Sequence, residues 1–279
     1  MSKNQRLCLD ACFLNKIVTK KDLEGIFSEK LINRAISYNI LLEKDNSLKF
    51  TISFMPYDDY ILLRDEHRLY DVFELDSKKI KDRVWIGADS IIFAKFLKKY
   101  LKNKFYNKII DIGSGTGIQT IISSKFSKLC ISVDNNKRAT YYTKLNTNIN
   151  QIKNVEIFQS NMFEKTNTKF DLIFANPWFI DLEKGGLEDV PDIVEGLKDY
   201  LNKDGLCILL LNSYVKNGKD TVYDYLKNIV ISRNYDLDLY TIGYKIETFR
   251  INDFRKHGID YCVGYYAVIK KHGSGILKR

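Results

Sequence analysis

The sequence lacks any stretch of about 18 uncharged apolar residues, so it predicts no helix that could cross a membrane. Its opening residues, MSKNQRLCLDACF, contain neither a long apolar run nor a small-residue cleavage site, which argues against a signal peptide. We therefore expect a cytoplasmic protein. The 279 residues, of which 45% are apolar, are enough for one large α/β domain and a small appendage.

Cysteine is scarce, and its five positions are odd in number and scattered along the chain. Such a set argues against a disulfide framework. Cys8 and Cys12 have helical i, i+4 spacing, but no second ligand pair follows at zinc-finger spacing. We expect buried free thiols and no metal site.

Arginine-rich tracts, RNA-binding aromatic signatures and zinc knuckles are missing, although the net charge is +9. A basic protein attracts polyanions, so the net charge permits a nucleic-acid partner. The lysines, however, accompany abundant asparagine and isoleucine, which indicates a composition bias across the whole chain. The charge by itself therefore does not favour nucleic acid as the partner.

Residues 1–75 are expected to form a separate small α+β unit. Their pattern predicts three helices and then a two-stranded hairpin, at 5–17, 20–27, 29–38, 40–43 and 48–55. These elements are typical of a winged-helix-like module, which binds DNA or holds a partner. Four acidic side chains disfavour binding of this module to DNA: Asp22, Glu24, Glu29 and Asp45. We expect it to recognise a substrate or a partner.

Residues 76–279 alternate between strands and helices, which predicts a Rossmann-like parallel sheet with crossover helices. The expected strands are 108–112, 129–133, 155–159, 170–175 and 206–211, and the expected helices are 117–125, 137–150 and 193–201. Two late strands, 237–245 and 261–270, complete a seven-stranded sheet with one antiparallel edge. Just before the sheet, we expect Asp89 or Ser90 to cap a helix over 91–101.

The strongest local signal is the run IIDIGSGTG, an apolar strand that leads into a glycine-rich turn and a helix. Gly113, Gly115 and Gly117 let the backbone turn tightly and approach a ligand. A dinucleotide site would need its third glycine at the position of Ile118, and no Gly-Lys-Ser/Thr follows for a P-loop. Asp111 would repel a pyrophosphate but suits the cationic ammonium of S-adenosylmethionine (SAM).

The next two strand ends offer polar groups for the rest of a nucleoside. Asp134 follows the glycine loop by about 20 residues, where an acidic side chain accepts both ribose hydroxyls. The alternative is that Asp134 caps the following helix. At the third strand end, Asn161 can bind the adenine amino group while Met162 covers the ring. An ordinary turn is the alternative for Asn161.

The fourth strand ends in Asn176-Pro177-Trp178-Phe179. A planar NH₂ group is a weak nucleophile because its lone pair is delocalised. The Asn176 side-chain oxygen and the Pro177 carbonyl can each accept one of its hydrogens, which aligns the lone pair with a methyl carbon. Trp178 and Phe179 can form a wall for a flat acceptor. A turn that merely ends the strand is the alternative.

With these motifs in place, residues 83–271 resemble the class I SAM-dependent methyltransferases. The likeness is greatest to the Asn-Pro-Pro-aromatic group, which includes release-factor glutamine methyltransferases and small-domain RNA guanine N2-methyltransferases. The run VDNNKRA resembles the second motif of that group, and FDLIFANP resembles its fourth. The run GADS, with Asp89 and Ser90, resembles an upstream element near the methionine end of SAM. One departure is Trp178, which replaces the second proline.

The resemblance implies an N-methyltransferase that converts SAM to S-adenosylhomocysteine. It assigns the cofactor to Asp89, Ser90, Asp111, Gly113, Ser114, Gly115, Gly117, Asp134, Asn135, Asn161 and Met162. Asn176 and Pro177 would be catalytic, and the acceptor would be a peptide, a protein or a small molecule. One alternative is a methyltransferase of RNA or DNA bases, and another is a SAM-binding regulator without catalysis. O- or C-methylation would need a base, and the three histidines lie outside these motifs.

Overall fold

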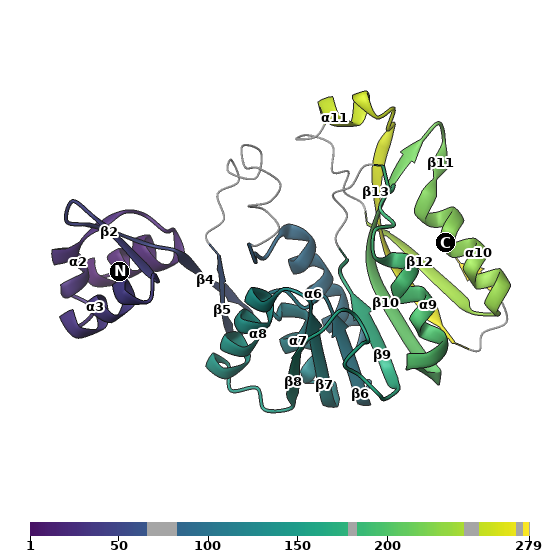
Figure 1. Ribbon diagram of the computed structural model, residues 1–279, viewed down its shortest axis with the longest axis horizontal. Helices are drawn as coiled ribbons and strands as arrows, with labels where there is room; N and C mark the ends of the chain where they lie inside the picture. Colours follow the sequence, from purple (N-terminus) through teal and green to yellow (C-terminus); the bar gives the residue numbers. More distant parts are fainter. Residues whose placement is uncertain (66–82, 178–182, 243–250, 272–275, 279) are drawn as a thin grey trace.

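A computed structural model describes residues 1–65, 83–177, 183–242, 251–271 and 276–278. Its central feature is a nine-stranded sheet in which eight strands lie in the order β14-β12-β13-β10-β9-β6-β7-β8 and β11 pairs with β10 (Figure 1). The strands are β6 (Tyr106–Ile112), β7 (Ser127–Asp134), β8 (Val155–Gln159), β9 (Phe170–Ala175), β10 (Leu201–Lys216), β11 (Lys219–Asp220), β12 (Asp236–Ile242), β13 (Tyr261–Lys270) and β14 (Leu277–Lys278). The sheet confirms the predicted Rossmann-like α/β fold but has nine strands where seven were expected, because the two-residue strands β11 and β14 were not predicted.

The sequence pattern predicted an antiparallel strand at the edge of the sheet. In the structure the antiparallel strand, β13, lies inside the sheet. β13 pairs antiparallel with β10 on one side and with β12 on the other. β13 is mostly buried, whereas the alternating burial of β12 leaves polar positions for solvent. A strand buried on both faces fits the interior of a sheet that is covered on both sides, whereas a half-exposed strand fits a place nearer the edge, and β13 accordingly lies between β12 and β10.

Helices cover both faces of the sheet. They are α6 (Ala88–Tyr100), α7 (Ile118–Ser124), α8 (Lys137–Ile149), α9 (Val190–Tyr200) and α10 (Thr221–Arg233), and a further short helix, α11 (Ile251–Lys256), precedes β13. On one face, Phe93 and Leu97 of α6 pack against Phe174 and Leu210. On the other face, α9 and α10 pack against the odd-numbered positions of β10. None of the helices in the described ranges combines the length and the apolar character that a membrane-spanning helix needs.

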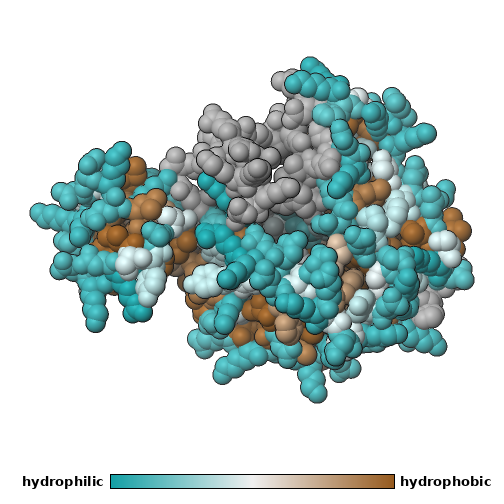
Figure 2. Space-filling view, viewed as in Figure 1, coloured by the Kyte–Doolittle hydropathy of each residue, from teal (hydrophilic) through white to brown (hydrophobic). Residues whose placement is uncertain are grey.

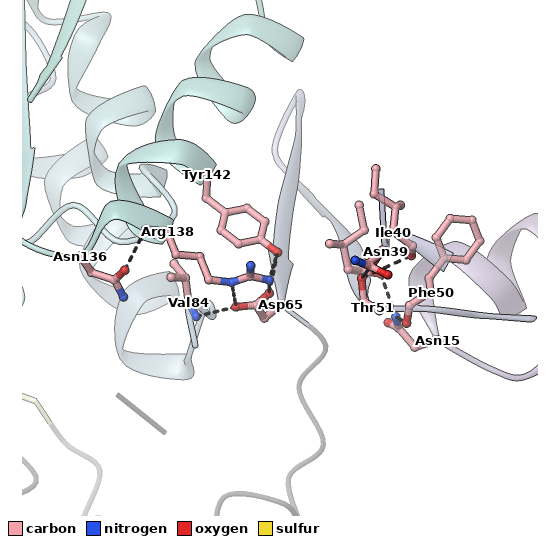
Figure 3. Close-up of polar contacts among 11 residues, drawn as sticks. Asn15, Asn39, Ile40, Phe50, Thr51, Asp65, Val84, Asn136, Arg138 and Tyr142 are labelled. Carbon is pink, nitrogen blue, oxygen red and sulfur yellow. Dashed lines mark hydrogen bonds and ion pairs between the residues drawn. The ribbon is translucent and has the colours of Figure 1, made fainter. Parts of the chain in front are cut away.

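The N-terminal residues form a lobe of their own beside the sheet (Figure 1). It contains α1 (Lys3–Cys8), a π-helical turn (Leu9–Phe13), β1 (Val18–Thr19), α2 (Lys20–Glu24), α3 (Glu29–Ser37), β2 (Leu41–Lys44) and β3 (Ser47–Phe50). The helix expected over 5–17 therefore ends early. Asn15 has a positive φ of 48° and donates hydrogen bonds to the carbonyls of Phe50 and Ile52, which turns the chain toward the hairpin (Figure 3).

The hairpin of β4 (Ile52–Tyr57) and β5 (Tyr60–Asp65) links the lobe to the sheet. Tyr60 and Leu62 pack against α7, and Leu63 packs against α8. At the end of β5, Asp65 accepts hydrogen bonds from Val84, Arg138 and Tyr142 (Figure 3). Burial opposes ionisation of Asp65, but these hydrogen bonds and the Arg138 charge outweigh it and lower the pKa of the carboxyl. The proposed domain boundary at residue 75 lies outside the described residues.

Candidate functional site

A pocket of about 570 Å³ lies at the carboxyl ends of β6, β7, β8 and β9. At this point the strand order reverses, since β6 contacts β7 on one side and β9 on the other. Such a switch point is where open α/β sheets bind ligands. Most of the predicted site residues line this pocket: Asp89, Ser90, Gly113, Ser114, Gly115, Asp134, Asn135, Asn161, Met162, Asn176 and Pro177. Trp178 and Phe179 lie outside the described residues.

The three glycines of the loop have different surroundings. All have a positive φ, which favours glycine. A Cβ added to Gly113 or Gly115 would meet no atom within 4 Å, so their backbone stays open to the pocket. A Cβ on Gly117 would lie 2.8 Å from Cγ2 of Thr143 on α8. Gly117 is not among the lining residues and instead permits close packing of the two helices.

Asp111 does not face the pocket, contrary to the expectation from its position beside the glycine loop. Its carboxyl is 2% exposed and accepts a 2.5 Å hydrogen bond from the Thr120 hydroxyl on α7. Burial raises its pKa to about 7, against the opposing Thr120 hydrogen bond and with a further contribution from Asp134. Because alternate strand residues point to opposite faces, the Asp111 side chain points toward α7 and is not among the residues that line the pocket.

Asp134 lies at the end of β7 and lines the pocket. Its two oxygens accept 2.9 Å hydrogen bonds from the backbone N–H groups of Gly115 and Asn136. Burial raises the pKa of this carboxyl, and the two N–H groups oppose the rise. The helix cap of α8 is Asn136, whose side chain accepts from the N–H of Arg138, so the capping alternative for Asp134 is wrong. The carboxylate is held in place with lone pairs left for ligand hydroxyls.

The residues expected near adenine lie on the short loop after β8. Nδ2 of Asn161 donates a 3.0 Å hydrogen bond to Glu164, which leaves Oδ1 to accept from an amino group. Met162 has a positive φ of 44° and lines the pocket beside it. The loop also contains Ser160, a lining residue that sequence reasoning missed although it adjoins Asn161.

Asn176 reaches the first turn of α6 from the end of β9. Its Nδ2 donates a 2.7 Å hydrogen bond to Oδ2 of Asp89. Because a carboxylate only accepts, this contact orients the amide, and Oδ1 of Asn176 is left buried with no partner among the described residues. Asp89 or Ser90 was expected to cap α6. The N-cap residue is instead Gly87, which has no side chain, so no side-chain hydrogen bond caps this helix.

Several further lining residues were not predicted from the sequence. Gln119 lies two residues after the glycine turn, and spacing could have found it; it donates to the carbonyl of Ser90 and ties α7 to α6. Trp85, Asp189 and Ile193 come from the segment before α6 and from α9, which only the tertiary fold brings to the pocket.

The pocket carries an excess of negative charge. Among its lining residues, Asp89, Asp134 and Asp189 are acidic, and Arg83 is basic. Burial, with help from Asp192, also raises the pKa of Asp189. A cation would stabilise these carboxylates, whereas a pyrophosphate would be repelled. The open glycine backbone, the carboxylate at the second strand end and this charge together fit a sulfonium nucleoside.

Comparison of this sequence with known proteins identifies the family to which the chain belongs. The model of the methyltransferase small domain matches residues 90–234, just over half of the chain. A Methanocaldococcus jannaschii protein described as a "putative protein N5-glutamine methyltransferase" is 31% identical over 171 residues, which cover 54% of this chain and 84% of that protein. The ribosomal protein L11 methyltransferase of Thermosipho melanesiensis is 28% identical over 81% of this chain and 82% of its own length.

A solved structure shows the same fold. TYW2 from M. jannaschii, in complex with AdoMet, has a TM-score of 0.51 and 16% identity, and the match covers 80% of this chain and 90% of that chain. The family match, the acidic pocket and the open glycine loop agree on one cofactor. The chain belongs to the methyltransferase small-domain family and is a SAM-dependent methyltransferase.

Proposed function

We propose that the protein transfers the methyl group of SAM to a nitrogen atom of a peptide, a protein or a small molecule. The observation that carries the proposal is the Asn176 amide. Its Oδ1 is buried and has no partner in the described part of the chain, while its Nδ2 donates a hydrogen bond to Asp89. A buried acceptor without a donor is costly, so we assign this oxygen to an N–H group of the methyl acceptor.

The remaining pocket residues would hold the cofactor. The open backbone of Gly113, Ser114 and Gly115 would contact the methionine half, Asp134 the ribose hydroxyls, and Asn161 with Met162 the adenine. The role proposed from sequence for Asp111 is not part of this arrangement, because its carboxyl is buried against Thr120. SAM supplies a methyl group on a positively charged sulfur and leaves as S-adenosylhomocysteine.

Asn176 and Pro177 would position the acceptor nitrogen. With Oδ1 of Asn176 and the main-chain carbonyl of Pro177 each accepting one hydrogen, the lone pair of the nitrogen is directed away from both. The nitrogen forms the new N–C bond as the S–C bond breaks, and its proton then leaves to solvent. Positioning and electrostatic complementarity supply the acceleration, so this mechanism needs no general base before transfer.

The test combines a substrate search with a variant. The purified chain is incubated with labelled SAM and pools of peptides, RNA and metabolites, and mass spectrometry identifies the methylated atom. Asn176→Ala should lower the rate of transfer about 10²-fold or more while the Kd for SAM, from calorimetry, stays unchanged. Asn148→Ala, at an exposed position of α8, is the matched control. An Asn176→Ala enzyme with normal turnover, or methylation at oxygen or carbon, would contradict the proposal.

A further inference from the structure

Asn212, in the second half of β10, is the least expected polar residue of the sheet. The residue is 0% exposed, and neither Oδ1 nor Nδ2 has a hydrogen-bond partner among the residues that the structure describes. Proteins rarely bury one polar atom unpaired, and here both ends of an amide are unpaired. Such a side chain lowers the stability of the free protein, so its presence needs a functional reason.

The position of Asn212 relates it to Asn176. β9 ends at Ala175, which pairs with Leu209, so Asn176 comes beside Leu210 and Asn212 lies two residues further along β10. Alternate residues share a face of the sheet. This is the face covered by α6, because Leu210 packs there and Asn176 reaches Asp89. From strand spacing and rise, the Cα atoms of Asn176 and Asn212 lie roughly 8 Å apart.

Glycines on both neighbouring segments shape the surroundings of Asn212. On β13, Gly264 pairs directly with it, and a Cβ at Gly264 would come within 3.5 Å of Oδ1. The same Cβ would lie 3.2 Å from Cβ and Cδ1 of Ile242, so Ile242 packs over Gly264 on this flank and contributes no polar group to the amide. On the other side, Gly186 packs so closely that a Cβ would lie 1.8 Å from the main-chain oxygen of Asn212. The backbone is thus held from both sides while the side-chain amide remains unpaired.

We infer that Asn212 is a second acceptor-binding residue and that its side-chain amide forms hydrogen bonds with the main chain of a peptide acceptor. A residue in extended conformation presents its N–H and C=O along one edge, which matches the oxygen and the NH₂ group of an asparagine side chain. The acidic lining of the neighbouring pocket disfavours the phosphates of a nucleic acid. The inference rests on the proposed role of Asn176, which would hold the target nitrogen of the same acceptor.

This arrangement makes Asn212 a determinant of specificity. An acceptor without adjacent N–H and C=O groups would leave one or both amide atoms unpaired, as in the free protein. A site built to make hydrogen bonds rejects ligands that lack the matching groups. Peptides should therefore be better acceptors than simple amines that carry the same target nitrogen.

The first measurement is the thermal stability of Asn212→Leu in the full chain. Leucine has a similar size and no polar atoms, so Tm should stay the same or rise. A clear fall in Tm would show that the amide has a structural role and would overturn the inference.

The second measurement follows the side-chain NH₂ signal of Asn212 by NMR, assigned by its loss in Asn212→Leu, with S-adenosylhomocysteine present. The probe is acetyl-glutamine methylamide, and its matched control is the ester that replaces the main-chain N–H by oxygen. The signal should shift with the amide probe, and Asn212→Leu should weaken probe binding about tenfold. No shift, equal binding of the ester, or a shift with guanosine alone would overturn the peptide assignment.

Asn176→Ala separates this inference from the proposed function. In that variant, methyl transfer should be lost while the Asn212 signal still responds to the probe. Normal transfer in Asn176→Ala together with a responding Asn212 signal would refute the catalytic role and leave peptide binding in place. If Asn176→Ala loses methyl transfer but the Asn212 signal of the wild type does not shift with the probe, the catalytic role of Asn176 is supported and peptide binding by Asn212 is refuted.

Discussion

The proposed cofactor and acceptor halves of the site differ in how their polar groups are paired. In the cofactor half, both oxygens of Asp134 accept backbone N–H groups, and the Gly113 N–H is bound by β7. In the acceptor half, Oδ1 of Asn176 and both amide atoms of Asn212 have no partner in the described structure. The protein's own groups satisfy the polar atoms of the first half, whereas polar atoms of the second half lack hydrogen-bond partners among the described residues. We expect stability to depend on the first and substrate choice on the second.

The largest effect we expect comes from Asp111, beneath the cofactor half. Its folded-state pKa of about 7 exceeds the ordinary value of 3.8, so the folded state binds more protons between these values. Stability should therefore fall as pH rises from about 4 to 7, by up to roughly 4 kcal/mol. Asp111→Asn can still accept from Thr120 and should remove this trend. Unfolding curves from pH 4 to 8 would show it, and an equal slope in both proteins would contradict the prediction.

A comparison of two glycines tests which part of the loop is structural. Gly117→Val combines a φ of +81° with a clash against Thr143 and should cost about 3 kcal/mol of unfolding free energy. Gly115→Ala has open space around its Cβ, so it should cost only about 1 kcal/mol, from its positive φ. Gly115→Ala should weaken SAM binding instead. Denaturant unfolding and calorimetry measure the two effects, and similar stability losses would remove the distinction.

Removal of the carboxylate at the end of β7 should separate the cofactor half from the acceptor half. Asp134→Ala loses the proposed ribose contacts and the bond to the Gly115 N–H, so the Kd for SAM should rise about 10²-fold. Titration calorimetry measures the change, with Asn176→Ala as the variant that should bind SAM normally. Equal weakening in both variants would mean that the two halves do not act separately.

The smallest effect should come from Asp89, at the junction of the halves. Asp89→Leu frees the Asn176 amide to rotate, and the rate of transfer should fall about tenfold. Asp89→Asn can still accept from Nδ2 and should restore most of the rate. If Asp89 contacts SAM instead, the Kd for SAM will rise in Asp89→Leu, whereas a positioning role leaves it unchanged.

Features that depend on neighbouring residues in the chain were predictable. Strands β8, β9 and β13 have the predicted limits, because short apolar runs between turn residues mark them. The residues at strand ends, such as Asp134 and Asn176, meet in one pocket because parallel strands end at the same edge of a sheet. Helix α10 was missed, and the long β10 was predicted only over its buried middle.

The sequence by itself determined the alternation of strands and helices from β6 to β9, the glycine turn and the set of strand ends that form the site, since each depends on side-chain type and local spacing. Only the tertiary structure decided that Asp111 turns away from the pocket, that Asp89 holds an amide 87 positions along the chain, and that Asn212 stays unpaired on the same face as Asn176. These depend on which strands become neighbours and on which helix covers each face. Contacts between distant segments settle both, and no local pattern encodes them.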